Sequence, residues 1–273
     1  MAAIYAVMNR KGGVGKTTTA VTLAHGLALR LRKETGTGYV LIVDLDPQGH
    51  VAKALGVKHN GQLADVLLDP KQDIREAVVP THREGLFVLP SSDRLADAKI
   101  DLLSRHLAEV IDYRRRRRRR VTLDEILSTR LAPANEAFDY IIVDCPPSLD
   151  MLEDAVYRYA DAAIVPVKPD YLGTAGTVQH TTDILEAQTD GFDIRIEVIV
   201  PTFFRSREVL ANQMYGELRD MFGKQKVADP IPQAAVLEQA PATRQQTIFE
   251  YAPGHPAARA YGKLVNRIYG NGR

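Results

Sequence analysis

Short, almost entirely apolar segments recur along the chain, and each ends at a polar or proline residue. Six such runs cover residues 4–8, 39–43, 86–89, 140–143, 162–167 and 194–200. Their length and composition predict β-strands. Strands that are apolar on both faces are typical of a parallel sheet covered by helices on both sides.

Helical spacing fills most of the gaps between these runs. It is clearest from Thr17 to Arg32, where the apolar positions are Ala20, Leu23, Ala24, Leu27, Ala28 and Leu31. Strands that alternate with helices predict an α/β fold with a mostly parallel, twisted sheet and helices on both faces. Ligands in such sheets bind beyond the carboxyl ends of the strands, so candidate chemistry is expected there.

The composition is that of a folded globular protein, with 45% hydrophobic residues and 35 Lys+Arg against 34 Asp+Glu. This balance gives no overall attraction to nucleic acid, so any basic surface must be local. The single cysteine, Cys145, excludes an internal disulfide and a metal site built from several cysteines. No apolar run approaches the roughly 18–20 residues that span a bilayer, and residues 1–5 lack signal-peptide features. We expect a cytoplasmic protein.

One local run breaks the charge balance. Seven consecutive arginines follow Tyr113, namely Arg114, Arg115, Arg116, Arg117, Arg118, Arg119 and Arg120. Adjacent like charges repel, so we interpret residues 112–122 as a solvated insertion or a frayed helix end within one domain spanning residues 1–273.

A glycine-rich loop joins the first predicted strand to the first predicted helix. Its residues are Lys11, Gly12, Gly13, Val14, Gly15, Lys16, Thr17 and Thr18. The glycines let backbone N–H groups approach phosphate oxygens, and the helix N-terminus adds partial positive charge. Lys16 would reach the β- and γ-phosphates, and the Thr17 hydroxyl would bind Mg²⁺. The order strand, loop, helix makes a plain glycine turn the less favoured interpretation.

Two residues of this loop depart from the common phosphate-loop pattern. Arg10 stands where that pattern has its first glycine, and Lys11 is a second lysine five residues before Lys16. Lys11 is either a solvated loop lysine or a cation that projects towards a nucleotide bound by a second subunit.

Carboxylates follow two of the other predicted strands. Asp44 and Asp46 come after the second run, and Asp144 follows the fourth. A lone aspartate at such a place is commonly a helix cap or a solvated loop residue. Three of them beside a phosphate loop favour a role in metal binding or catalysis instead.

These motifs together resemble the ParA/MinD family of deviant Walker A ATPases. Residues 11–18 resemble its Walker A motif, residues 44–49 (Asp-Leu-Asp-Pro-Gln-Gly) its second motif, and residues 141–149 its Walker B motif. The resemblance covers nearly the whole chain and is greatest to the short, Soj-like partition proteins. It implies a P-loop NTPase-like fold of about seven or eight strands.

The resemblance also implies a mechanism. The protein would be a Mg²⁺-dependent ATPase that forms a homodimer around two ATP molecules. Lys11 would match the signature lysine that reaches the partner's phosphates, and Asp46 would match the residue that activates water. Asp44 and Asp144 would hold Mg²⁺ through its water shell. By the same analogy, Pro201, Thr202 and Pro232 should border the adenine, although these residues equally suit a strand end and a turn.

Partition ATPases of this kind bind DNA without sequence preference as ATP-bound dimers. Arg207 matches a family arginine implicated in DNA contact, whereas Gln233 and Val236 are uncharged where relatives carry basic residues. The arginine run is either a replacement source of charge or a solvated insertion without a partner. The resemblance further implies a ParB-like centromere-binding protein that stimulates hydrolysis, and association with the nucleoid.

Other functions of the same fold are weighed against partition. A MinD-like membrane ATPase needs a C-terminal amphipathic anchor, but the stripe of Leu264, Val265, Ile268 and Tyr269 predicts a core helix. Positioning of a protein cluster would use the same motifs and stays open, as does a switch with slow turnover. An iron–sulfur reductase component needs two cysteines per chain and is rejected.

Overall fold

The computed structural model describes residues 1–59, 62–116, 122–170 and 181–271, and the side chains of these residues except 109–116. Arg117 to Arg120 therefore lie outside the described residues. Arg114, Arg115 and Arg116 form the end of a long helix, α5. The prediction of an insertion at residues 112–122 within a single domain stays a prediction.

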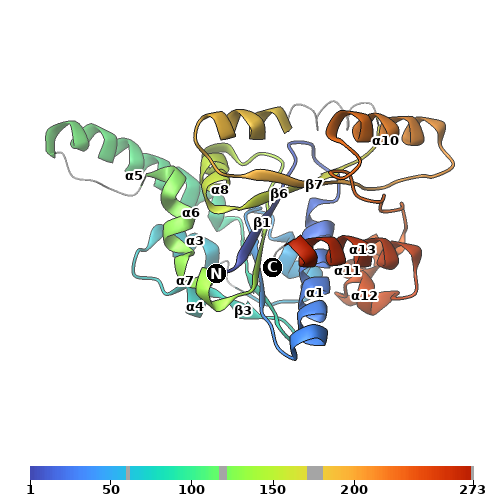
Figure 1. Cartoon of the computed structure of the whole chain (residues 1–273). Helices are drawn as coiled ribbons and strands as arrows, with labels where there is room; N and C mark the ends of the chain where they lie inside the picture. The colour runs from blue at the N-terminus through green and yellow to red at the C-terminus, as the bar shows by residue number, and fades with distance from the viewer. Residues whose placement is uncertain (60–61, 117–121, 171–180, 272–273) are drawn as a thin grey trace.

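A seven-stranded sheet in the order β3-β4-β2-β5-β1-β6-β7 forms the centre of the described structure. The strands are β1 (Ala3–Val7), β2 (Val40–Asp44), β3 (Val79–Pro80), β4 (Leu86–Leu89), β5 (Tyr140–Asp144), β6 (Ala162–Val167) and β7 (Arg195–Pro201). All pairings are parallel except that between β3 and β4. The parallel pairing of β1, β2 and β5 brings their carboxyl ends to one edge of the sheet. Figure 1 shows the sheet between the helices that cover it.

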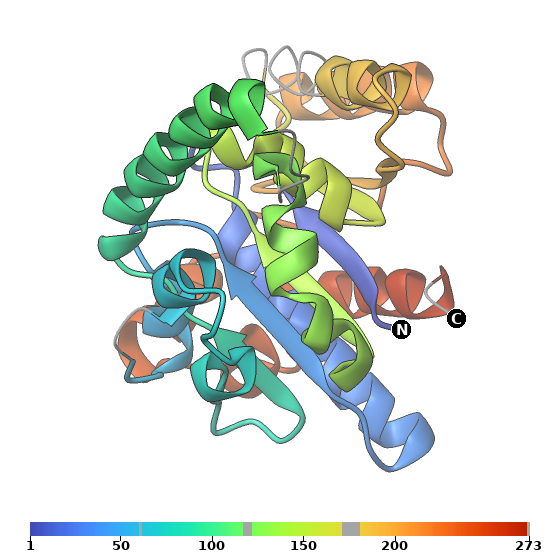
Figure 2. The same cartoon turned by 90° about the vertical axis from the view of Figure 1, so that its left-hand side faces the viewer.

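Helices cover both faces of this sheet. One face carries α1 (Lys16–Thr35), α2 (His50–Leu55), α11 (Val236–Arg244), α12 (Ile248–Tyr251) and α13 (Pro256–Asn271). The other carries α3 (Gln62–Leu68), α4 (Ile74–Ala77), α5 (Arg94–Arg116), α6 (Ile126–Arg130), α7 (Ala132–Ala137), α8 (Glu153–Tyr159), a helix over residues 181–189 and α10 (Val209–Phe222). Figure 2 views the molecule from the side of α3 to α7.

The central strands bury both of their faces, as their apolar composition predicts. In β1, Ile4 and Ala6 join the core under α3 to α8, whereas Tyr5 and Val7 join the core under α1 and α13. Consecutive side chains of a strand point to opposite faces, so a strand between two helical layers must be apolar throughout. The predicted α/β architecture is confirmed.

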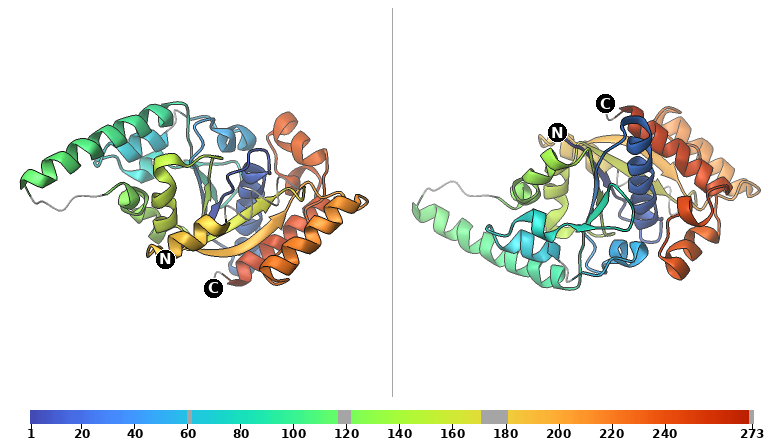
Figure 3. Two further views of the ribbon diagram at one scale, coloured as in Figure 1. Left: turned by 90° about the horizontal axis from the view of Figure 1, so that it is seen from above. Right: turned by 90° about the horizontal axis from the view of Figure 1, so that it is seen from below.

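Helices α13 and α5 differ in how closely they pack against the rest of the protein. The predicted core helix at the C-terminus is confirmed, because α13 packs against α1 and buries Leu264, Val265, Ile268 and Tyr269. By contrast, α5 extends away from the body of the domain (Figure 3). Ile100, Leu103 and Leu107 are exposed along it. In the described residues, no helix has both the length and the apolar character needed to span a bilayer.

Candidate active site

The glycine loop adopts a conformation that only glycine reaches easily. Gly13 and Gly15 have φ values of +70° and +84°, in the left-handed region that L side chains disfavour. Gly15 precedes α1 without any side-chain cap, and the first turn of α1 contains no acidic residue. The N–H groups at this helix end are therefore available to an anion, as the loop sequence predicts.

Two buried polar residues fasten the loop to neighbouring strands. Asn9, at the end of β1, donates its amide to the Pro166 carbonyl of β6 at 2.9 Å and accepts the Lys11 N–H at 2.9 Å. On the other side, the Thr202 hydroxyl lies 2.8 Å from the Val14 carbonyl and 3.1 Å from the Val167 carbonyl. These bonds fix the loop between the ends of β6 and β7.

Lys16 is buried within the loop. The residue is only 6% exposed, and its ammonium donates to the Lys11 carbonyl at 2.9 Å. Burial lowers the pKa of Lys16, while Asp144 and Asp46 act in the opposite direction. Lys16 is thus held at the centre of the loop, where its charge would face the phosphates.

Lys11 projects from the rim of the same loop. Its ammonium forms an ion pair of 2.9 Å with Asp170 Oδ1, and both side chains keep about 30% exposure, 29% and 31%. Arg10, beside it, contacts Glu153 at 3.1 Å and Asp183 at 2.9 Å. The two departures from the common loop pattern are therefore cations with carboxylate partners in their own subunit. The sequence indicated neither pairing, because the partners lie more than 140 residues away.

The predicted carboxylates meet at the carboxyl ends of neighbouring strands. Asp44 of β2 and Asp144 of β5 occupy paired positions and are both fully buried. Burial raises the pKa of Asp44 to about 7, although the N–H groups of Asp46 and Val51 donate to it. Burial, followed by repulsion from Asp44, holds the pKa of Asp144 well above its usual range. A cation between or beside these groups would stabilise their charged forms.

A divalent cation fits this pair. Neither carboxylate oxygen of Asp144 has a hydrogen-bond partner of good geometry within the described residues, and such a buried group is costly. The Thr17 hydroxyl also acts on Asp144 and lowers its pKa. In the described part of the chain, no three His, Cys, Asp or Glu residues gather into a metal site. Mg²⁺ here would therefore need Thr17, phosphate and water oxygens as ligands.

Asp46 lies two residues beyond Asp44 and is half-buried. Its Oδ1 accepts the Gln48 N–H at 2.9 Å, so the side chain is oriented by the start of the following loop. Burial lowers the pKa of Lys99 on α5, while the negative charges of Asp150 and Asp46 act in the opposite direction. Sequence reasoning did not single out Lys99. Cys145 is buried and burial raises the pKa of its thiol, as expected of a packing residue.

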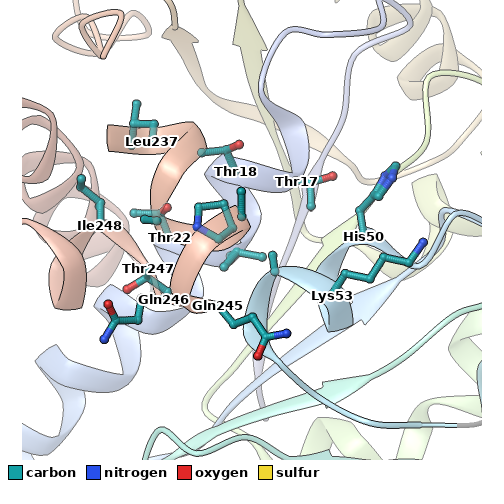
Figure 4. Close-up of a pocket in the computed structure, with 15 residues that line it drawn as sticks. Thr17, Thr18, Thr22, His50, Lys53, Leu237, Gln245, Gln246, Thr247 and Ile248 are labelled. Carbon is teal, nitrogen blue, oxygen red and sulfur yellow. The ribbon is translucent and has the colours of Figure 1, made fainter. Parts of the chain in front are cut away.

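A cavity of about 510 Å³ opens beside the start of α1. Thr17, Thr18 and Thr22 line it from α1, His50 and Lys53 from α2, and Leu237 together with residues 245–248 from the other side (Figure 4). The residues predicted to border adenine do not line this cavity. The Thr202 hydroxyl bonds two carbonyls, Pro201 ends β7, and Pro232 pairs with Phe204. Their role towards adenine stays a prediction.

A row of basic residues on α13, which we call the basic row, lies outside the motifs identified in the sequence. Arg259, Lys263 and Arg267 lie four residues apart on α13, opposite its buried stripe. Lys224 joins Lys263 and Arg267 around a hollow of about 300 Å³. The acidic residue of that lining, Asp229, pairs with Lys263 at 2.8 Å. The spacing of four was visible in the sequence, but a basic row on an exposed helix face is commonplace. Arg207, predicted from the resemblance, is exposed between β7 and α10.

Comparison with known proteins agrees with the geometry. Residues 2–198 match the model of the AAA_31 family, described as an AAA domain. The chain is 34% identical over 243 residues to the chromosome partitioning protein ParA of Myxococcus xanthus, covering 87% of this chain and 78% of that protein. It is 31% identical over 276 residues to the sporulation initiation inhibitor protein Soj of Bacillus subtilis, with both chains fully covered.

A solved structure extends the comparison to a bound ligand. The fold is similar to that of cobyrinic acid a,c-diamide synthase from Mycobacterium smegmatis with a bound ATP analogue and magnesium. The TM-score is 0.75 at 27% identity, and the match covers 100% of this chain and 98% of the other. The fold thus serves proteins with different tasks, so the task must be argued from the site.

Proposed function

Because the chain belongs to the AAA_31 family and is a relative of the ParA and Soj partitioning proteins, we propose that it is a Mg²⁺-dependent ATPase that dimerises around ATP and partitions a chromosome or plasmid. The observation that carries this proposal is the convergence of Lys11, Lys16 and three aspartates at one edge of the sheet. The common phosphate-loop pattern has a lysine at the position of Lys16 but requires none at the position of Lys11.

The phosphate site would work by positioning and by neutralising charge. Backbone N–H groups of residues 12–18 would hold phosphate oxygens, and Lys16 would place its cation against the β- and γ-phosphates. Thr17 would bind Mg²⁺, with Asp44 and Asp144 holding the waters of the metal. When bound, Mg²⁺ supplies positive charge to the transferring phosphoryl group.

Hydrolysis would depend on the second subunit. Asp46, oriented by the Gln48 N–H, would orient the attacking water and accept its proton. Lys11 would leave its own subunit and neutralise charge on the partner's phosphates, as a cation supplied in trans does in other phosphoryl-transfer enzymes. ATP would thereby act both as substrate and as the bridge of the dimer.

DNA would bind to the ATP-loaded dimer through its phosphates, and this binding would place the protein on the nucleoid. The basic row of α13, with Lys224, supports this part of the proposal because it concentrates positive charge on one exposed face. Arg207 and the run from Arg114 to Arg120 are the further candidates. Since a dimer doubles each patch, affinity should depend strongly on the ATP-driven association.

A ParB-like centromere-binding protein would stimulate hydrolysis and so release the dimer from DNA. This partner follows from the kinship with ParA and Soj alone. Its effect would be measured as an increase in phosphate release when the protein is added.

The proposal is tested by DNA mobility shift with ATP, ADP or no nucleotide, repeated over a salt series. We expect a shift with Mg²⁺ and ATP only, and a steep loss of affinity as salt rises. Equal weak binding in all three nucleotide states would contradict the proposal. A parallel flotation assay with anionic vesicles identifies the alternative: ATP-dependent binding to vesicles without DNA binding would indicate a MinD-like positioning ATPase.

A further inference from the structure

The ion pair of Lys11 has a consequence for dimerisation. The Lys11 ammonium bonds Asp170 of its own subunit, so a phosphate of the partner must compete with that carboxylate for it. We propose that Asp170 is a positioning residue that holds Lys11 within its own subunit until a triphosphate in the partner displaces it. This inference rests on the proposed function, since it concerns the same lysine.

The contact is built into the fold rather than left to two mobile side chains. Asn9, only 2% exposed, bonds both the Pro166 carbonyl at the end of β6 and the Lys11 N–H. Asp170 follows β6 by three residues, and its own N–H donates to the Lys168 carbonyl at 2.8 Å. The loop that bears Lys11 and the turn that bears Asp170 are therefore joined through one buried amide.

Asp170 also has a second cation at hand. Lys168 Nζ lies 3.3 Å from Asp170 Oδ2, while Lys11 Nζ lies 2.9 Å from Oδ1. When Lys11 leaves, the carboxylate keeps Lys168 and stays paired. Departure of Lys11 therefore leaves no unpaired charge, which makes an exchange of partners feasible.

The exchange replaces one anion by another. A triphosphate carries more negative charge at its end than a single carboxylate, so it can compete for the Lys11 ammonium. A diphosphate lacks the terminal group and would leave Lys11 with Asp170. The pair thus makes the release of Lys11 sensitive to the γ-phosphate, and it opposes association in the ADP-bound and nucleotide-free forms.

The size of the effect is modest because the pair is about a third exposed. Exposed ion pairs contribute about 0.2–1 kcal/mol, and two pairs are lost for each dimer formed. Asp170→Asn should therefore lower the dimer dissociation constant by between about 2-fold and 30-fold. Lys168→Gln should raise that constant, since it removes the cation that stays paired with Asp170 when Lys11 leaves.

Two readouts separate the contact from its consequence. The first is the rate of acylation of Lys11 by an amine reagent in the nucleotide-free protein, measured by mass spectrometry. The second is the dimer dissociation constant from sedimentation with Mg²⁺ and a non-hydrolysable ATP analogue. The controls are Asp170→Glu, which keeps the charge, and Asp193→Asn, which removes an exposed carboxylate before β7.

We expect Asp170→Asn to acylate faster at Lys11 and to dimerise more tightly, with both controls close to the parent. Unchanged acylation would overturn the contact, and faster acylation with an equal or weaker dimer would overturn its inhibitory role. Failure of the parent to dimerise with the analogue would instead contradict the proposed function, while the acylation result would still decide whether Asp170 holds Lys11.

Discussion

The catalytic edge of the sheet and the basic face of α13 both gather charged groups, but they do so in opposite ways. At the edge, Lys16 and Asp144 are almost completely buried, and the positive charge of Lys16 counters the rise that burial causes in the pKa of Asp144. On α13, the side chains of Lys263 and Asp229 are 71% and 61% exposed. Buried charges interact strongly and tolerate few arrangements, whereas exposed charges are screened by water and salt.

This difference separates two kinds of function. Phosphoryl transfer requires cations and carboxylates held in a fixed geometry, and the buried edge supplies it. Non-specific attraction to a polyanion needs only enough positive charge on one side. We therefore expect single substitutions at the edge to abolish activity, and several substitutions on α13 to be needed for a clear loss of DNA binding.

Lys16→Ala should give the largest effect. It removes the buried cation that would face the phosphates. Loss of one group that stabilises transition-state charge lowers kcat by about 100- to 1,000-fold, so we expect a fall of that size in kcat for ATP. Steady-state phosphate release measures this. Lys33→Ala, at the exposed end of α1, is the matched control and should keep the parent rate. A Lys16→Ala protein with more than a tenth of parental kcat would contradict the assignment.

Asp144→Asn should have a smaller effect on activity and almost none on folding. The amide keeps the shape of the carboxyl but cannot hold the waters of Mg²⁺ as strongly, so metal affinity should fall about 10- to 100-fold. Because burial holds the pKa of this carboxyl well above its usual range, its charged form is unfavourable without a metal, and the neutral amide should not destabilise the metal-free protein. Magnesium titration of ATPase activity, with a thermal melt in EDTA, checks both points; a variant with normal Mg²⁺ dependence would exclude this role.

Substitutions in the basic row of α13 should have the smallest effect, a change in the salt dependence of DNA binding. In the double variant Lys263→Gln/Arg267→Gln, the slope of log affinity against log salt should become shallower by about 0.9 for each lost phosphate contact, or about 2 in all. Basal ATPase activity should not change. Lys33→Gln/Lys71→Gln removes the same charge from other exposed positions and should leave the slope unaltered.

Replacing Arg114 to Arg120 by a Gly/Ser linker tests whether the arginine run, the second basic region, also contributes to DNA binding. If the run contacts DNA, affinity should fall and the slope should flatten further. If only this replacement has an effect and the α13 variant matches the parent, DNA binding belongs to the end of α5 and not to α13.

The sequence located the strands and motifs whose residue types are fixed by their local surroundings. The apolar runs predicted β1, β2, β4, β5, β6 and β7 to within one or two residues, because strands buried on both faces must be apolar. β3 was missed because it has only two residues, one of them a proline, and pairs antiparallel at the edge. The phosphate loop and the aspartates after β2 and β5 could be located because their spacing is fixed by the strand ends.

Contacts between distant segments could not be predicted in this way. Nothing in the sequence near Lys11 points to Asp170, and nothing near the motifs points to Lys99 on α5. The bond from the Thr202 hydroxyl to the Val14 carbonyl was likewise not indicated, and the predicted place of Thr202 beside adenine stays a prediction. The contacts of Asp170 and Thr202 with the loop arise from the order of strands in the sheet, which places β6 beside β1 and β7 beside β6.

Sedimentation velocity of the parent and of Lys11→Ala, each with Mg²⁺ and a non-hydrolysable ATP analogue, tests the central claim most directly. The account predicts a dimer for the parent and a monomer for Lys11→Ala, with nucleotide binding retained in the variant. A stable dimer of Lys11→Ala would contradict it, because the lysine would then have no part in joining the two subunits.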